Sequence, residues 1–152
     1  MRAAAFRVFL LASFASIAMA AQPQGPILCT KSSLVEVLSF DKLPDGIKLI
    51  LAPRRAGLDG IADRGEEFNR GDAIVGSLPL RRFNLAGLGS NCAIVSIQHG
   101  GGLEFGFELF AFRRATTGWV LEGKRVGVGE PDSVKSLIEM ATFAFSRSQS
   151  DL

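Results

Sequence analysis

NCAIVSIQHGGGLEFGFELFAFRR, residues 91–114, carries the clearest secondary-structure pattern of the chain and predicts its fold class. From Ala93 to Gln98 the residues are β-branched or alternate between apolar and polar, which predicts a strand. A second strand is predicted from Leu103 to Phe112. Because successive side chains of a strand point to opposite faces, its large apolar residues at odd positions share one face. They are Leu103, Phe105, Phe107 and Leu109.

The three glycines between the runs predict the pairing of the two strands. A two-residue Gly-Gly turn sets Ile97 against Glu104 and mixes apolar with polar residues. A three-residue loop of glycines keeps one face apolar, and glycine supplies the positive φ that such loops need. The preferred register pairs Ile97 with Phe105, Val95 with Phe107, and Ala93 with Leu109.

In that register the other face of the hairpin is polar at the tip and apolar at the far end. Toward the tip it carries Gln98, Ser96, Glu104, Gly106 and Glu108. At the far end it carries Cys92, Phe110 and Phe112. The tip can face water, whereas the far end needs a cover.

Residues 1–20 are typical of a secretory signal. Arg2 and Arg7 precede a short apolar run, and Ala18-Met19-Ala20 is a small-residue cleavage site, so cleavage is predicted after Ala20. The run is too short to span a membrane, and no later run is long enough. We therefore expect one small domain over residues 21–152, in the periplasm or secreted.

The charge does not indicate a nucleic-acid partner. The chain has 17 basic and 15 acidic residues, but Arg2 and Arg7 fall in the predicted signal, which holds no acidic residue. The rest of the chain is therefore balanced, and its arginine pairs predict a solvated, salt-bridged surface.

The two cysteines, Cys29 and Cys92, are predicted to form one disulfide, because an exported chain meets an oxidising compartment. A reactive thiol pair is the alternative, but the chain has no C-x-x-C motif. The bridge would tie the N-terminal segment to the apolar far end of the hairpin.

Other segments follow local patterns. Thr30–Phe40 fits a short helix capped by Thr30 or a strand through Val35–Leu38, and the helix is preferred. Strands are predicted at Ile47–Leu51, at Ala73–Val75, at Leu80–Ala86 with Phe83 and Leu85 on one face, and at Trp119–Val126.

The last segment predicts an amphipathic helix that begins at Pro131, with Asp132 at its positive end. Its apolar stripe should pack on the sheet, with Cys92, Phe110 and Phe112 as partners. The stripe comprises Val134, Leu137, Ile138, Ala141 and Phe145.

The glycine-rich segment Pro53–Asp72 predicts a long loop with several carboxylates. Their spacing does not match a calcium loop, so no metal site is predicted. Long loops are often functional, and Asp63 and Glu66 are candidate contacts to a partner.

The chain carries few groups for acid–base catalysis, and we predict no cofactor, because no nucleophile elbow, P-loop or zinc motif occurs. His99 is the one histidine. Glu104 and Glu108 lie ~13 Å apart along a strand, which exceeds the ~5 to 9.5 Å between paired glycosidase carboxylates.

The sequence therefore predicts an α+β fold: an antiparallel meander sheet of four to six strands, a C-terminal helix and an N-terminal segment tied on by the disulfide. The preferred function is a non-catalytic binding module, such as a periplasmic inhibitor or immunity-type protein with an envelope enzyme as partner. Its candidate contact residues are Gln98, His99, Glu104, Glu108, Asp63 and Glu66. The alternatives are a small hydrolase using His99 with a carboxylate, and a carrier of a small apolar ligand.

Overall fold

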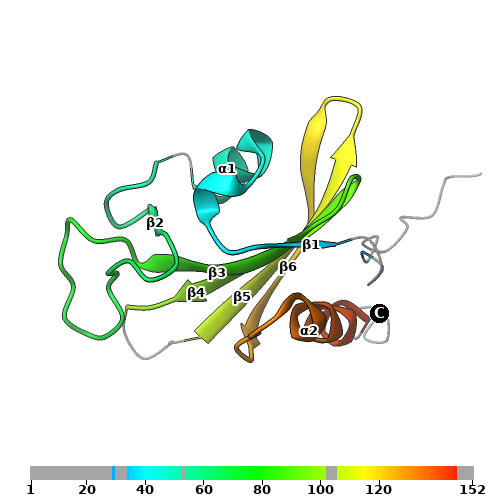
Figure 1. Cartoon of the computed structure of the whole chain (residues 1–152). Helices are drawn as coiled ribbons and strands as arrows, with labels where there is room; N and C mark the ends of the chain where they lie inside the picture. The colour runs from blue at the N-terminus through cyan, green and yellow to red at the C-terminus, as the bar shows by residue number, and fades with distance from the viewer. Residues whose placement is uncertain (1–28, 30–33, 53, 102–105, 147–152) are drawn as a thin grey trace, which may run out of the picture.

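In the computed structural model, which describes residues 29, 34–52, 54–101 and 106–146, one sheet has a helix on each face (Figure 1). The predicted signal, residues 1–20, lies outside the described residues. In chain order the elements are β1 (Val35–Val37), η2 (Phe40–Lys42), α1 (Asp45–Leu51), β2 (Ile61–Ala62), β3 (Arg81–Leu88), β4 (Cys92–His99), β5 (Gly106–Ala115), β6 (Gly118–Val128) and α2 (Val134–Ser146).

The strands follow the order β1-β3-β4-β5-β6, and each neighbouring pair in this order is antiparallel. The short β2 pairs in parallel with the start of β3. The prediction of an antiparallel sheet with a C-terminal helix is thus confirmed, and the parallel β2 is an addition to it.

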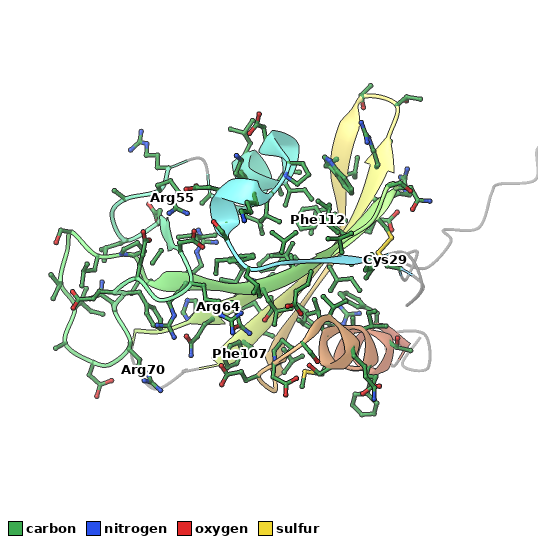
Figure 2. All side chains as sticks on the ribbon, in the orientation of Figure 1. Cys29, Arg55, Arg64, Arg70, Phe107 and Phe112 are labelled. Atoms are coloured by element: carbon green, nitrogen blue, oxygen red, sulfur yellow. A yellow bond between two sulfur atoms is a disulfide. The ribbon has the colours of Figure 1, made fainter. Side chains whose placement is uncertain are left out.

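Both faces of the sheet are buried. One face, here called the α1 face, lies under η2 and α1; the other, the α2 face, lies under α2. Figure 2 shows Phe112 on the side of α1 and Phe107 on the side of α2. The α1 face packs Phe83, Val95, Ile97, Phe110 and Phe112 against Phe40, Ile47 and Leu51. The α2 face packs Leu85, Cys92, Ile94, Leu109 and Ala111 against Leu137, Ala141 and Phe145.

The predicted hairpin register was wrong by three residues. In the structure Ile97 pairs with Glu108, Val95 with Phe110, and Ala93 with Phe112. Because the sheet is covered on both sides, a single apolar face does not decide the register. A shift by an odd number of residues exchanges the two faces of β5 relative to β4. Phe110 and Phe112 therefore lie under α1, and of the three residues predicted to contact the C-terminal helix only Cys92 lies on the face that this helix covers.

A bulge in β3 explains a second difference. Phe83 pairs with Ile97 and Leu85 with Ser96, so the register shifts at Asn84. Phe83 and Leu85, predicted to share a face, therefore enter opposite cores. The bulged Asn84 donates its side-chain amide to the carbonyl of Pro131 at 2.8 Å, which attaches the segment before α2 to the sheet.

The elements before β3 also differ from the prediction. Val35–Val37 is a strand, not part of a helix, because it pairs with Ala86–Leu88 at the sheet edge; Thr30–Ser33 lies outside the described residues. Ile47–Leu51 belongs to helix α1, not a strand, and buries Ile47 and Leu51 one turn apart. Residues 73–75 are irregular.

The predicted disulfide between Cys29 and Cys92 is confirmed, with a sequence separation of 63 residues. Helix α2 has the predicted buried stripe, although it begins at Val134 and not at Pro131. A carboxylate oxygen of Glu36 in β1 accepts a hydrogen bond from the backbone N–H of Val134 at 3.2 Å. This bond satisfies one of the free donors at the start of α2.

Candidate functional site

A long irregular segment joins β2 to β3 and projects from the end of the sheet opposite the disulfide (Figure 1, Figure 2). Every residue from 70 to 77 in it is exposed. The segment contains Gly71, Gly76 and Pro79, residues that favour turns over strands. We call residues 70–78 the clasped loop, because its backbone closes around one buried side chain.

That side chain is Asn69, which is only 3% exposed. Its Nδ2 donates to the carbonyls of Val75 at 2.9 Å and Leu78 at 2.7 Å. Its Oδ1 accepts from the N–H of Val75 at 2.7 Å. The backbone N–H of Asn69 donates to the carbonyl of Pro79 at 2.8 Å and closes the base of the loop. The loop conformation is therefore fixed from within.

The clasped loop rests on the end of the β4–β5 hairpin. Gly100 donates its N–H to the carbonyl of Leu80 at 2.8 Å. A Cβ atom added at Gly100 would lie 2.1 Å from the carbonyl oxygen of Asn69, so only glycine permits this approach. The hairpin end and the 53–72 segment, which both hold predicted contacts to a partner, are therefore adjacent in the structure.

Gln98, one of the predicted contact residues, lies below this region. It is 4% exposed, and its Oε1 accepts from Nε and Nη2 of Arg82 at 3.1 and 2.6 Å. The guanidinium of Arg82 stacks 4.5 Å from the ring centre of the buried Phe68. These contacts give Gln98 a supporting position below the surface.

Asp63 and Glu66 connect the loop segment to η2 and to each other. Asp63 accepts from Ser39 Oγ at 2.7 Å and from Phe40 N at 2.8 Å, and Glu66 accepts from Asp63 N at 2.6 Å. Burial alone would raise the pKa of Asp63, but these hydrogen bonds, with one from Arg64 N, hold that pKa below its usual value. Both carboxylates thus bind their own chain.

The remaining predicted contacts are dispersed. Glu108 is 5% exposed; its Oε1 lies 2.7 Å from Lys124 Nζ, and its Oε2 has no hydrogen-bond partner among the described residues. Glu108 lies on the α1 face and Gln98 on the opposite one. His99 is half-buried at the end of β4. Glu104 lies outside the described residues.

The alternative functions depend on concave sites. Three surface hollows of about 490, 370 and 330 Å³ lie among the described residues, and His99 lines none of them. Phe40 lines the first of these hollows and Phe143 the third, whereas Phe83, Phe110 and Phe112 are packed into the core and line none of the three. The described residues hold no group of three or more histidine, cysteine or acidic side chains that could bind a metal.

The clasped loop presents two aliphatic side chains to solvent. Ile74 is 48% exposed and Val75 is 50% exposed. The sequence predicted a loop only as far as Asp72 and a strand at Ala73–Val75, which is wrong, and it indicated no role for Asn69. The available signal was an asparagine ahead of a Gly/Ser/Pro-rich stretch, since asparagine side chains hydrogen-bond nearby backbone.

Comparisons with protein-family models, with curated proteins and with solved structures give no match for this chain. Neither described helix, α1 or α2, is long and apolar enough to cross a membrane. The disulfide is consistent with an oxidising location outside the cytoplasm.

Proposed function

We propose that this chain is a non-catalytic binding module that holds a protein partner through the clasped loop. The observation that carries the proposal is the arrangement around Asn69: a buried amide fixes an exposed loop whose tip is aliphatic. The exported location predicted from the signal sequence remains part of this proposal, and the partner belongs to the same compartment.

Pre-organisation supports a role in binding. Fixing one residue of a flexible chain costs about 1–2 kcal/mol, and a loop that is ordered before binding does not lose that entropy on association. The side chain of Asn69 holds the backbone of Val75 at two points, the N–H and the carbonyl of Val75. The buried side chain of Asn69 makes its hydrogen bonds to an exposed loop and not to the core, which favours a functional role for the loop conformation.

The aliphatic tip supports a protein partner with an apolar recess. Full burial of a valine or isoleucine side chain contributes about 1.5–3 kcal/mol. Ile74 and Val75 are already about half buried. Covering the remainder of both therefore contributes about 1.5–3 kcal/mol, a factor of about 10 to 150 in affinity.

Site-directed photocrosslinking tests the proposal. A photoreactive residue replaces Ile74, and the full disulfide-bonded chain is exposed to the soluble envelope and secreted proteins of its own cells. We expect a defined crosslinked protein that disappears when unlabelled wild-type chain competes. Absence of any competed product at position 74 would contradict the proposal.

A matched control variant distinguishes binding through the clasped loop from non-specific binding by any exposed aliphatic side chain. Val126 on β6 is 66% exposed, aliphatic and outside the loop. The V126D variant should compete for the partner as well as the wild type does, whereas I74D/V75D should compete at least about tenfold less well. Equal competition by the two variants would place the contact surface elsewhere.

A further inference from the structure

Resting on the proposed function, we propose that the partner is a serine endopeptidase that accepts branched aliphatic residues, and that the Ile74–Val75 bond is its target. The chain then acts as a substrate-like inhibitor, which binds in the enzyme cleft and is cleaved and resealed in place.

The shape and chemistry of the loop fit such an enzyme. Enzyme sites are concave, and the clasped loop projects from the end of the sheet with both neighbours of the bond exposed (Figure 1). The pocket that receives the residue before the cleaved bond sets the specificity, and in elastase-type enzymes it is small, without the charged specificity of the trypsin pocket. Ile74 supplies a branched aliphatic side chain at that position.

The hydrogen bonds divide at the Ile74–Val75 bond. The N–H and carbonyl of Val75 are both held by Asn69. The N–H and carbonyl of Ile74 make no hydrogen bond within the part of the chain that the structure describes. The acyl side of the bond is therefore open to the enzyme, and the amine side is held by the inhibitor.

This division has a consequence for the reaction. The enzyme's serine Oγ attacks the Ile74 carbonyl carbon and its proton passes to the catalytic histidine. The carbon–nitrogen bond to Val75 then breaks as an ester forms, and the proton goes to the departing nitrogen. That nitrogen is the atom that Asn69 Oδ1 holds at 2.7 Å. It stays beside the ester, attacks it in the reverse direction and competes with water.

Both ends of the loop remain attached after the cut. The base is closed by Asn69 N to the Pro79 carbonyl, and Leu80 is bonded to Gly100 in the hairpin end. The new termini therefore stay within one folded molecule, where the effective concentration of the amine is far above that of a free peptide. Hydrolysis takes up one water, resealing releases it, and no other reactant is needed.

An inhibition assay with the full disulfide-bonded chain tests the inference. An elastase-type enzyme and a trypsin-type enzyme are titrated with wild-type chain, and cleavage is mapped by mass spectrometry. We expect stoichiometric inhibition of the elastase-type enzyme and a single slow cut between residues 74 and 75. Isolated cut chain, returned to the enzyme, should regenerate intact chain.

Two variants separate retention of the amine from binding. N69A, which loosens the loop, should bind up to about 100-fold more weakly, but at saturating enzyme it should be cleaved at least tenfold faster than the wild type, with no regeneration of intact chain. I74D should neither inhibit nor be cut at this bond. No inhibition of the elastase-type enzyme by the wild type, inhibition of the trypsin-type enzyme alone, or a cut elsewhere would each overturn the inference.

The outcomes also distinguish this inference from the proposed function. If the photocrosslinker at position 74 captures a competed partner while the elastase-type enzyme is not inhibited, the loop is a contact surface and the endopeptidase inference is wrong. If the enzyme is not inhibited and position 74 captures nothing, both fail.

Discussion

Replacement of Asn69 by alanine tests whether its side-chain hydrogen bonds hold the clasped loop. It removes three hydrogen bonds, two to the carbonyls of Val75 and Leu78 and one from the N–H of Val75. At a net contribution of about 1 kcal/mol each, the loop loses about 3 kcal/mol of local stability. That corresponds to an increase of about 100-fold in the population of the open loop.

Amide hydrogen exchange measures this change directly. The Val75 amide should exchange about 100-fold faster in N69A than in the wild type, because Asn69 Oδ1 is its acceptor. The amide of Val95, which lies in the middle of β4, serves as the internal reference. Its exchange should change much less, since the loop opens without unfolding the sheet.

The N69D variant gives a second comparison. Aspartate keeps an acceptor for the Val75 N–H, but a buried carboxylate oxygen takes the place of the amide donor and faces the carbonyl oxygens of Val75 and Leu78. Val75 protection should therefore fall at least as far in N69D as in N69A. If the Val75 amide exchanges equally fast in the wild type and in N69A, the side chain of Asn69 does not hold the loop, and the reasoning is wrong.

Three further changes test the supports of the site and of the fold. G100A should lower the free energy of unfolding by about 1–3 kcal/mol because its Cβ would meet the Asn69 carbonyl, whereas G106A, with open space around its Cβ, should be nearly neutral in urea unfolding. Replacing Cys29 and Cys92 together by serine should cost up to about 4 kcal/mol, and an unchanged urea midpoint would contradict the disulfide's role. Hydrogen bonds lower the pKa of Asp63, so its stabilising contribution is full above the unfolded pKa of about 3.9 and is lost as the pH falls toward the folded pKa. The D63N variant should therefore lose less stability than the wild type below about pH 4, and identical acid profiles would contradict this.

The sequence was sufficient where a pattern had only one physical solution. Alternation in Ala93–Gln98 predicted β4, the stripe through Leu137 and Ala141 predicted α2, and two cysteines in an exported chain predicted their bridge. The strand and the helix follow from local periodicity, and the bridge follows because the chain has only two cysteines, so none of the three predictions depends on tertiary packing.

The sequence failed where two solutions were close in energy. Phe107 and Leu109 lie on one face of β5, and Phe110 and Phe112 point to the other, so both faces are apolar. An apolar pattern on both faces fits more than one register, and the packing of α1 decides between them. Helix α1 was itself read as a strand, because only tertiary packing showed Ile47 and Leu51 on one helical face.

The candidate site was the least predictable part of the chain. Its key residue, Asn69, acts through hydrogen bonds to backbone six and nine residues away, and the loop is placed by a contact with Gly100 that only the fold reveals. Residues selected for their charge, such as Asp63 and Glu66, proved to bond their own backbone.

Both proposals require that the clasped loop is already ordered in the free protein. Backbone ¹⁵N relaxation of the purified, disulfide-bonded chain measures this at the Ile74 and Val75 amides. We expect an order parameter of about 0.85 at both amides, equal to that of β4. Values below about 0.6, the range of flexible loops, would contradict the claim and both proposals that rest on it.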